Sequence, residues 1–442
     1  MAFKINRKSL LSSNARIQVP WVKVTIEGSN GKVTFGVFSR VTKGYIGDRT
    51  IVNDTETYLR EAYQVDYPNY IQSLNIIKIN GQVNQYTLNI VYPITVNSDP
   101  NFFEKIFSSA SKTRKIIFTY GDAATPAYVY KEESAIITTI SENFNLEGSS
   151  ISYTVKAISG AALNTIYCDN FNARTSKPSD VIKELWKTNR GNIRSVFTGM
   201  NKNNLDTYIA GNDKVVEIKA KQNISVLDYI SYLVSCMYAE EDSDIENPNS
   251  VYVLTIDDNS MYNYEDDTIQ GAYFKVEKVS YDTEKSDAYE VDIGYNTRTI
   301  VTSFSIENNE NYSILYDYQN QLNDHKYVRR LDNKGKWVDV YSPAISSKNN
   351  EYVTSAEDKT WWTKITQFPV NATMTIQGLL RPAQLLTYLR LNIIFPGGVG
   401  PDNTRMHIGS GLYIITKQED HFSSEGYRTT LSLTKVSGAL LK

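Results

Sequence analysis

Residues 411–436 decide the fold, and they read GLYIITKQEDHFSSEGYRTTLSLTKV. Two runs of alternating polarity flank a short polar loop, Ser-Ser-Glu-Gly, and this pattern predicts a β-hairpin. Gly411 and Gly426 flank the hairpin where its ends must bend, because glycine adopts backbone conformations that other residues avoid. His421 is assigned to the loop, and the surrounding sequence offers it no catalytic partners. We therefore interpret the loop as a bend and a contact surface, and not as an active site.

Three side chains of this hairpin have expected positions. Tyr413 and Tyr427 are expected to cover a barrel core at its open ends, with their hydroxyl groups in water. His421 directly follows Asp420, and we expect these two side chains to pair.

The overall composition is that of an ordinary globular protein. The chain has 442 residues, of which 41% are hydrophobic and 21% are charged, and this length suggests two to four domains. The net charge of -3 indicates no basic surface for nucleic acid. The chain holds 32 Tyr against 15 Phe, and a Tyr-rich composition favours strands and protein–protein contacts.

The sequence indicates no disulfide framework, metal site or export. Cys168 and Cys236 are too few and too far apart for a disulfide framework, and the histidines His325, His407 and His421 show no metal-ligand spacing. The first residues lack the apolar core of a secretion signal, and no apolar run is long enough to span a membrane. We expect a protein that is made and folded in a cytoplasm, without a cofactor.

Residues 1–164 predict an antiparallel β-barrel that carries one short helix. Hairpin signals occur at Gly28-Ser29-Asn30-Gly31 and at Asn80-Gly81. A helical period with a good N-cap occupies residues 99–112. The alternation in the strand after Asn80-Gly81 places four apolar side chains on one inward face, namely Tyr86, Leu88, Ile90 and Tyr92.

Residues 165–295 predict a small α+β domain, with one helix over 176–189 and another that starts near Ser225. Residues 296–442 predict a C-terminal β-barrel that contains an insertion at about 309–368, with a hairpin at 333–335. No period of repetition is obvious, although the two β-rich ends resemble each other, because each has a long loop or helix set into antiparallel strands. The expected fold class is therefore mainly β: two antiparallel β-barrels flank a small α+β domain.

Acidic clusters form the first group of candidate sites, because divalent cations prefer clustered oxygen ligands. None of them has EF-hand spacing, and we interpret them as solvated loops; whether the loop 240–246 binds a cation stays open. The clusters are Glu240, Glu241, Asp242, Asp244 and Glu246; Asp257 and Asp258; and Glu265, Asp266 and Asp267.

Two enzyme hypotheses are considered and set aside. Cys168 could act as a nucleophile with His325 or His421, but no protease signature surrounds it, and a buried structural thiol is the favoured interpretation. A polysaccharide-degrading enzyme needs a pair of carboxylates, and the sequence cannot pair the many that it contains. We therefore expect no enzyme activity and assign no catalytic residue.

Aromatic residues of the insertion suggest a contact surface. Trp361 and Trp362, with Tyr341 and Tyr352, could stack on sugars, but packing onto the barrel or onto a neighbouring protein is the favoured interpretation. The segments GSNGK and DNKGK resemble phosphate loops only superficially, because each lies between strands and does not lead into a helix.

The segments between residues 372 and 436 follow a recognisable order. A strand ends in glycine, a connecting segment turns a barrel corner, a Gly-bounded strand contains an aromatic residue, and a Gly-Tyr-x-Thr strand closes the series. These segments read ATMTIQG, LLRPAQLLTYLRLNIIFP, GSGLYIITKQEDHF and GYRTTLSLTKV. The order resembles the last barrel of phage tail baseplate hub proteins. That family includes the late-control D type hubs of contractile phages and the hub part of type VI secretion spike proteins.

The remainder of the chain agrees with this resemblance in outline. Residues 21–38 are similar to the opening strands of the first hub barrel, and residues 224–238 to the helix of the small domain between the barrels. The insertion at about 309–368 has no counterpart, and the chain shows no C-terminal spike domain and no lysozyme-like segment. The resemblance therefore implies a separate hub and not a fused hub and spike.

The resemblance also implies an assembly. Three chains with two barrels each would form a pseudo-sixfold ring that adapts a hexameric tail tube to a trimeric spike, with strand edges paired between copies. The implied partners are the tube protein, a spike or tail-tip protein and other baseplate proteins, in a virion that is assembled in the bacterial cytoplasm. DNA would pass through the lumen only transiently, so neutral or acidic side chains are expected there. The alternative is a receptor- or glycan-binding tail protein that uses the aromatic insertion.

Overall fold

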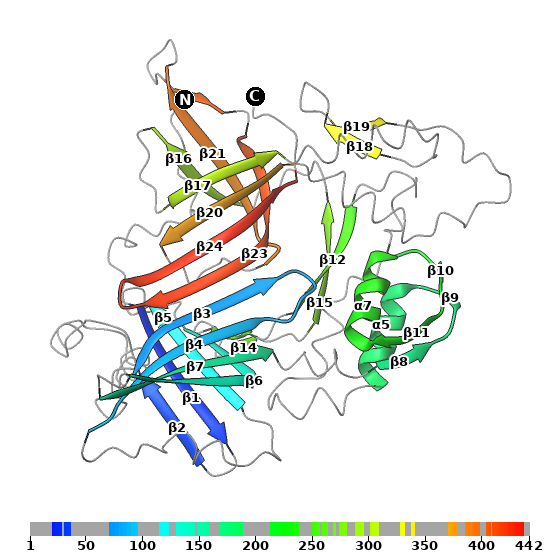
Figure 1. The fold of residues 1–442 in the computed structure, drawn as a ribbon. Coiled ribbons are helices and arrows are strands. Elements are labelled where there is room, and N and C mark those ends of the chain that lie inside the picture. The colour runs from blue at the N-terminus through cyan, green and yellow to red at the C-terminus, as the bar shows by residue number, and fades with distance from the viewer. Residues whose placement is uncertain are drawn as a thin grey trace.

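The computed structural model describes the chain in segments that together hold both β-rich ends and the middle. These are residues 20–28, 31–36, 70–95, 115–122, 130–145, 149–159, 168–188, 213–237, 250–256, 259–263, 268–270, 274–280, 288–295, 301–308, 328–331, 337–340, 370–377, 385–397, 404–407 and 409–436. Strands dominate these segments, so the protein is mainly β, as expected (Figure 1). The helix expected at residues 99–112 lies outside the described residues.

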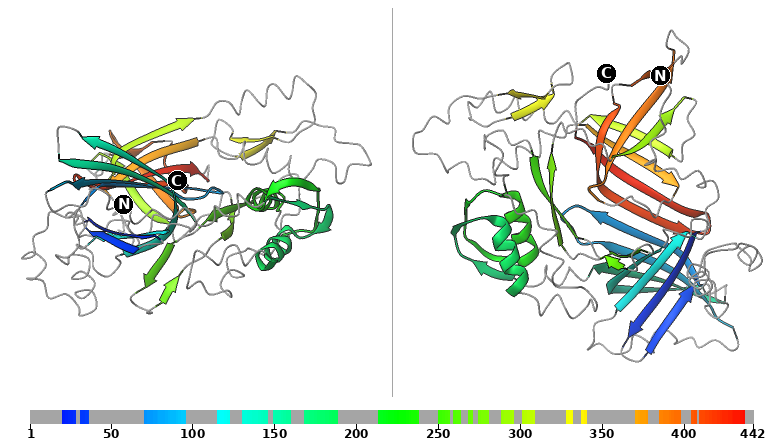
Figure 2. Two further views of the ribbon diagram at one scale, coloured as in Figure 1. Left: turned by 60° about the horizontal axis from the view of Figure 1, so that its bottom comes forward. Right: turned by 180° about the vertical axis from the view of Figure 1, so that it is seen from behind.

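The N-terminal strands form one antiparallel sheet in the order β3-β4-β7-β6-β5-β1-β2. In the view from behind, β1, β2 and β5 lie in front of the sheet that β3 and β4 begin (Figure 2). The strands are β1 (Pro20–Gly28), β2 (Gly31–Gly36), β3 (Ile71–Ile79), β4 (Gln85–Pro93), β5 (Lys115–Asp122), β6 (Tyr130–Asn145) and β7 (Ser150–Ser159).

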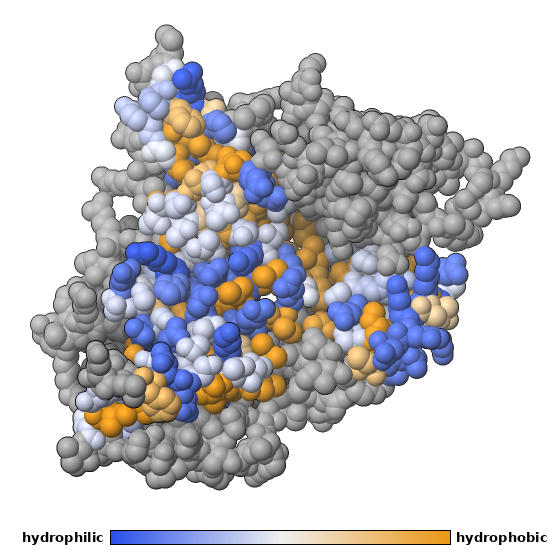
Figure 3. All heavy atoms as spheres, in the orientation of Figure 1, coloured by the Kyte–Doolittle hydropathy of each residue, from blue (hydrophilic) through white to orange (hydrophobic). Residues whose placement is uncertain are grey.

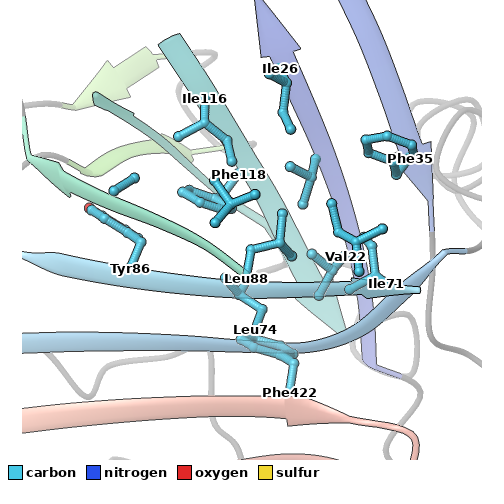
Figure 4. Packing of buried hydrophobic residues seen from close by; sticks show 14 of the residues in the cluster. Val22, Ile26, Phe35, Ile71, Leu74, Tyr86, Leu88, Ile116, Phe118 and Phe422 are labelled. Atoms are coloured by element: carbon cyan, nitrogen blue, oxygen red, sulfur yellow. The ribbon is translucent and has the colours of Figure 1, made fainter. Parts of the chain in front are cut away.

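Both hairpins predicted in this part are confirmed. β1 pairs with β2 as far as Gly28 opposite Gly31, and β3 pairs with β4 around Gly81, whose φ of 72° is a conformation that favours glycine. The predicted inward face of β4 is also confirmed, because all four of its side chains are buried in the N-terminal core. Figure 4 shows Tyr86 and Leu88 of this face pointing toward Phe118 and Ile116 of β5.

The middle of the chain holds both described helices, α5 (Pro178–Thr188) and α7 (Val226–Ser235), at the positions that the sequence predicts. The Ser225 side chain caps α7 by accepting a hydrogen bond from the backbone N–H of Asp228. Short strand pairs surround the helices: β8 (Cys168–Phe171) with β11 (Lys221–Ser225), and β9 (Arg174–Ser176) with β10 (Val216–Ile218).

Two further strand pairs connect the middle to the N-terminal sheet. β12 (Ser250–Ile256) pairs with β15 (Phe274–Ser280), and β13 (Asn259–Asn263) pairs with both β14 (Thr268–Gln270) and β6. At the turn between β3 and β4, the backbone N–H of Gly81 donates to Leu254 O of β12 at 2.7 Å. Because β12 packs in one core with α5 and α7, this hydrogen bond connects the helices and their short strands to one end of the N-terminal sheet.

Most pairs among the C-terminal strands are antiparallel, but β16 runs parallel to β21. A separate pair, β18 with β19, confirms the hairpin predicted around residues 333–335. The strands are β16 (Tyr289–Gly294), β17 (Val301–Asn308), β18 (Val328–Leu331), β19 (Trp337–Val340), β20 (Val370–Gln377), β21 (Tyr388–Pro396), β22 (Thr404–Met406), β23 (Gly411–Ser423) and β24 (Gly426–Lys435).

The two β-rich ends of the chain join edge to edge. β23 pairs with β3, so the strands follow one another as β17-β20-β24-β23-β3-β4-β7-β6-β5-β1-β2. In Figure 1, β17, β20, β24, β23, β3 and β4 follow one another down the molecule, with β7 and β6 below them. Residues far apart in the chain therefore share one continuous sheet. In the described part of the chain, no helix is long and apolar enough to cross a membrane.

Candidate functional site

The hairpin of residues 411–436 pairs with strands of both halves of the sheet. β24 lies along one side of β23, whereas the other side of β23 pairs with β21 near its start and with β3 from Lys417 to Ser423. Phe422 and Tyr427, at the tip, belong to the N-terminal core, and Tyr413, near the base, belongs to the C-terminal core. Figure 4 shows Phe422 reaching into the N-terminal core beside Leu74. The hairpin predicted from sequence is confirmed, and it is the joint of the fold.

The expected positions of the hairpin side chains are wrong in two respects. Tyr413 and Tyr427 do not keep their hydroxyls in water: their exposed fractions are 0% and 1%, because the sheet continues past both. His421 lies in β23 and is exposed, whereas Asp420 is buried. Neighbouring residues on a strand point to opposite faces, so these two side chains cannot pair.

Asp420 is instead the centre of a buried polar cluster at the joint. Its carboxylate accepts hydrogen bonds from Gln418 Nε2 at 2.6 Å, from Tyr427 Oη at 2.8 Å and from Thr429 Oγ1 at 2.6 Å. All three donors come from the hairpin itself, so the tip of the hairpin is held rigid where it enters the N-terminal core. The Tyr427 ring also stacks on Phe422, with ring centroids 4.1 Å apart.

A second buried carboxylate lies across the joint on β6. Glu133 accepts hydrogen bonds from Lys78 Nζ at 2.6 Å, from Tyr86 Oη at 2.7 Å and from the Tyr120 hydroxyl. The Tyr120 ring meets Phe422 edge-on at 5.2 Å and so connects the two polar clusters. Burial, and then the charges of Glu133 and Asp420, raise the pKa of Tyr120 well above its ordinary value.

These tyrosines predict a loss of stability in alkali. Burial raises the pKa of Tyr413, and burial together with the charge of Asp420 raises that of Tyr427. In the unfolded chain these tyrosines ionise near the ordinary pKa of 10.0, whereas in the folded chain they ionise at a higher pH. Their contribution to the free energy of unfolding is therefore complete below pH 10.0 and is lost as the pH rises toward the folded-state pKa. Each such tyrosine lowers the free energy of unfolding by about 1.4 kcal/mol per pH unit in that range.

Urea denaturation at about pH 9 and about pH 11, together with the ultraviolet absorbance of phenolate, measures this effect. We expect the buried tyrosines to ionise only as the fold is lost. Tyr413→Phe is the control, because it should reduce the steepness of the loss. Full ionisation of all tyrosines near their ordinary pKa, with the fold intact, contradicts the prediction.

The two halves of the sheet repeat one another, beginning with their longest hairpins. The β6–β7 register shifts between Ile137 and Thr139, and the β23–β24 register shifts between Ile415 and Lys417. Each shift falls at the threonine of an Ile-Ile-Thr segment, at 136–138 and at 414–416. A β-bulge of this kind bends a strand at a defined point, and here it bends both hairpins at the same point.

The extra residue of each bulge makes the same hydrogen bond. Thr138 Oγ1 donates to Lys156 O at 3.2 Å, and Thr416 Oγ1 donates to Ser432 O at 3.1 Å. Counted from the bulge, Lys156 and Ser432 occupy the same position on the second strand of the hairpin. The likeness of the hairpins therefore extends to individual side-chain contacts.

The neighbouring strand pairs repeat in the same way. The β3–β4 register shifts between Ile71 and Ser73, and the β17–β20 register shifts between Val301 and Ser303. The four-stranded sheet β3-β4-β7-β6 thus corresponds to the sheet β17-β20-β24-β23, strand for strand. No period of repetition is obvious from sequence, because few side chains are shared; the Ile-Ile-Thr segments are the signal that could have found it.

The outward face of this joined sheet is polar and mostly uncharged. Residues of neighbouring strands bond to one another along it: Asn89 Nδ2 donates to Ser73 Oγ at 2.8 Å, and Thr154 Oγ1 donates to Asn89 Oδ1 at 2.9 Å. The charges on it include both signs, as in the pair Lys417–Glu419 at 3.4 Å. Figure 3 shows hydrophilic and intermediate residues over much of the face, around a few apolar ones.

The other candidate residues do not form a catalytic or metal site in the described segments. Cys168 is exposed at the start of β8, so the expected buried thiol is wrong there, whereas Cys236 is buried beside α7. No group of three or more His, Cys, Asp or Glu in the described segments is arranged to hold a metal ion. The acidic clusters, His325 and the aromatic residues of the insertion lie outside the described residues.

Solved structures with a similar fold are tail and secretion proteins. The 43 kDa tail protein of prophage MuSo2 from Shewanella oneidensis is 10% identical, with a TM-score of 0.45 over 94% of this chain and 98% of that one. A tail protein from Neisseria meningitidis is 9% identical, with a TM-score of 0.47 over 94% and 96%. The E. coli c3393 protein, a type VI secretion component with structural similarity to the T4 tail proteins gp27 and gp5, is 9% identical, with a TM-score of 0.39 over 84% and 75%.

These proteins are of the kind that residues 372–436 resemble. No protein-family model and no curated protein sequence matches the chain. Because the TM-scores lie below 0.5, the functional argument rests on the residues of this chain.

Proposed function

We propose that the chain is the central hub of a phage tail tip or baseplate, and that three copies form a pseudo-sixfold ring between a hexameric tail tube and a trimeric spike. The observation that carries the proposal is the repeat of a four-stranded sheet, with both bulges kept, inside one continuous sheet. A chain that presents two equivalent surfaces presents six as a trimer, which is the number that a hexameric partner needs.

The dimensions of such a ring are suited to a channel. Each copy supplies the eight-strand path from β17 to β6, so three copies supply about 24 strands, and at about 4.8 Å per strand the ring is about 115 Å around and about 37 Å across. This is wider than a DNA double helix. We infer that the polar face lines the channel, because short uncharged side chains with balanced charges offer phosphates few places to bind.

The proposal also specifies the binding partners of the protein and its location in the virion. The partners are the tube protein, the spike or tail-tip protein and other baseplate proteins, within the virion, and the role is structural rather than enzymatic. We also propose that the chain divides into three parts near residues 164 and 295. The parallel pairing of β16 with β21 supports counting Tyr289–Gly294 with the C-terminal strands despite that boundary.

Light scattering on the purified chain, followed by electron microscopy, tests the proposal. We expect a particle with three times the mass of one chain and a ring with a central hole, either alone or on addition of the spike protein. A chain that stays monomeric at high concentration and in the presence of its spike contradicts the proposal. A monomer that binds cell-wall glycan would instead favour a receptor-binding tail protein.

A further inference from the structure

We propose that the ring closes when β6 of one copy pairs with β17 of the next copy, in the register that the chain already uses between β23 and β3. This inference rests on the proposed trimeric hub and adds the strands and residues that hold it together. Its basis is the internal repeat, in which β6 corresponds to β23 and β17 corresponds to β3. One junction of this kind is already formed within each chain.

The strand edges that the proposal joins have no partner among the described strands. β7 lies along one side of β6, and β5 occupies the other side only as far as Ile136. The corresponding part of β23, beyond its bulge, is the part that pairs with β3. β17 pairs with β20 on one side, and no described strand pairs with its other edge. The edge of β6 beyond its bulge and the edge of β17 are therefore both available for pairing between copies.

The exposure of β6 supports the same conclusion. Counted from the bulge, Phe144 corresponds to Phe422, and Glu142 corresponds to Asp420. Phe422 is 0% exposed under β3, whereas Phe144 is 58% exposed. Exposing a large aromatic side chain at a strand edge is unfavourable and typical of an interaction surface. The residue that fills the internal junction therefore has an uncovered counterpart.

The exposure of β17 completes the comparison. Counted from the second bulge, Phe304 corresponds to Leu74, and Ile306 corresponds to Ile76. Leu74 and Ile76 are both 0% exposed beneath the hairpin tip, whereas Phe304 and Ile306 are only half-buried. A strand laid against β17 would cover them as β23 covers β3.

The internal junction also fixes the register between copies. Phe422 lies opposite Leu74, so Phe144 is placed opposite Phe304 of the next copy. On the outward face, His421 lies opposite Asn75, and the corresponding pair is Asn143 and Ser305. The register thus places Phe144 and Phe304 opposite each other on the core side, and the short polar side chains of Asn143 and Ser305 opposite each other on the outward side.

Paired cysteines test this register. In a Cys168→Ser background, the full chain carries Asn143→Cys with Ser305→Cys, which the register places within disulfide reach of about 7 Å. Because each copy supplies one residue to each of two junctions, oxidation should give covalent dimers and trimers on a gel without reductant. The trimer should be the largest product, since the ring is closed.

Two controls accompany the test pair. Ser141→Cys with Ser303→Cys has similar exposure but is displaced by four residues, about 13 Å along the strand, and should give no covalent oligomer. Asn75→Cys with His421→Cys joins the corresponding positions within one chain and should give an intramolecular bond only. This second pair shows that oxidation works at such a junction.

A pair of matched single variants gives a second measurement. Phe144→Asp should raise at least tenfold the concentration at which trimers form, while the melting of the monomer is unchanged. Val215→Asp is the control, because Val215 is also 58% exposed but lies in the middle unit. An equal effect of both variants contradicts the proposal.

The outcomes separate this inference from the proposed function. Trimers that form without cross-linking of the test pair, while the intramolecular control pair is oxidised, overturn the β6–β17 junction and leave the hub standing. Cross-linking of the displaced pair to the same extent also overturns it. A chain that is monomeric under every condition overturns the hub and the junction together.

Discussion

Replacing Glu133 by alanine is expected to lower the free energy of unfolding by about 3–5 kcal/mol, the usual cost of removing one partner from a buried ion pair. Glu133 is 0% exposed, and Lys78, whose Nζ lies 2.6 Å from it, is 4% exposed. Without the carboxylate, an ammonium group and the hydroxyls of Tyr86 and Tyr120 remain in the core with their acceptor removed. Urea denaturation followed by circular dichroism measures the loss.

The neutral double variant Lys78→Met with Glu133→Leu distinguishes the ion pair from simple packing. It should be more stable than Glu133→Ala, since a buried pair can often be replaced by apolar side chains of similar size at little cost, although the hydroxyls of Tyr86 and Tyr120 still lack the carboxylate. Glu217→Ala is the matched control, because Glu217 is exposed and its removal should change stability by less than about 0.5 kcal/mol. A double variant no more stable than Glu133→Ala contradicts this account.

Replacing Asp420 by alanine is expected to cost about 3 kcal/mol and to loosen the joint between the two halves. Three donors, on Gln418, Tyr427 and Thr429, lose their acceptor inside the core, and each unsatisfied group costs about 1–3 kcal/mol before neighbouring groups relax. Thermal denaturation measures the loss, and hydrogen exchange should show faster exchange of the amides of β3 and β23.

His421→Ala is the control for this variant, since His421 is the adjacent residue on the same strand but lies on the outward face. Its effect should stay within about 0.5 kcal/mol. Equal effects of the two substitutions would mean that the carboxylate cluster does not stabilise the joint. Unchanged exchange in β3 would mean that the cluster acts only within the hairpin.

The local structure was readable from the sequence because its causes are local. Turn residues such as Asn80-Gly81, the helix start near Ser225 and the alternation of β4 each depend on a few neighbouring residues, and the structure confirms all three. The predictions for Tyr427 and Asp420 are wrong for one shared reason: the predicted loop is wider than the loop in the structure. Had β23 been extended to Ser423, the alternation would have placed Asp420 on the same face as Phe422, inside.

The joint and the repeat could not be predicted in this way. Alternation tells which face of a strand is buried, but not which strand lies beside it, and β23 pairs with a strand more than three hundred residues earlier in the chain. In the repeat, the backbone geometry at the bulges is kept while most side chains differ, so Thr138 and Thr416 are recognisable only once their hydrogen bonds are seen. The continuity of the polar face also depends on the joint.

The placement of Phe422 and Tyr427 in the N-terminal core has a consequence for the chain while it is being made. A ribosome adds roughly 5–20 residues per second, so roughly 20–70 s pass between the emergence of Leu74 and that of Phe422. During that interval the edge of β3 has no neighbour from its own chain at the place that β23 will occupy. The nascent protein therefore exposes the unpaired, aggregation-prone edge of β3 until translation is nearly finished. Slower synthesis or a shortage of chaperones should increase aggregation of the nascent protein.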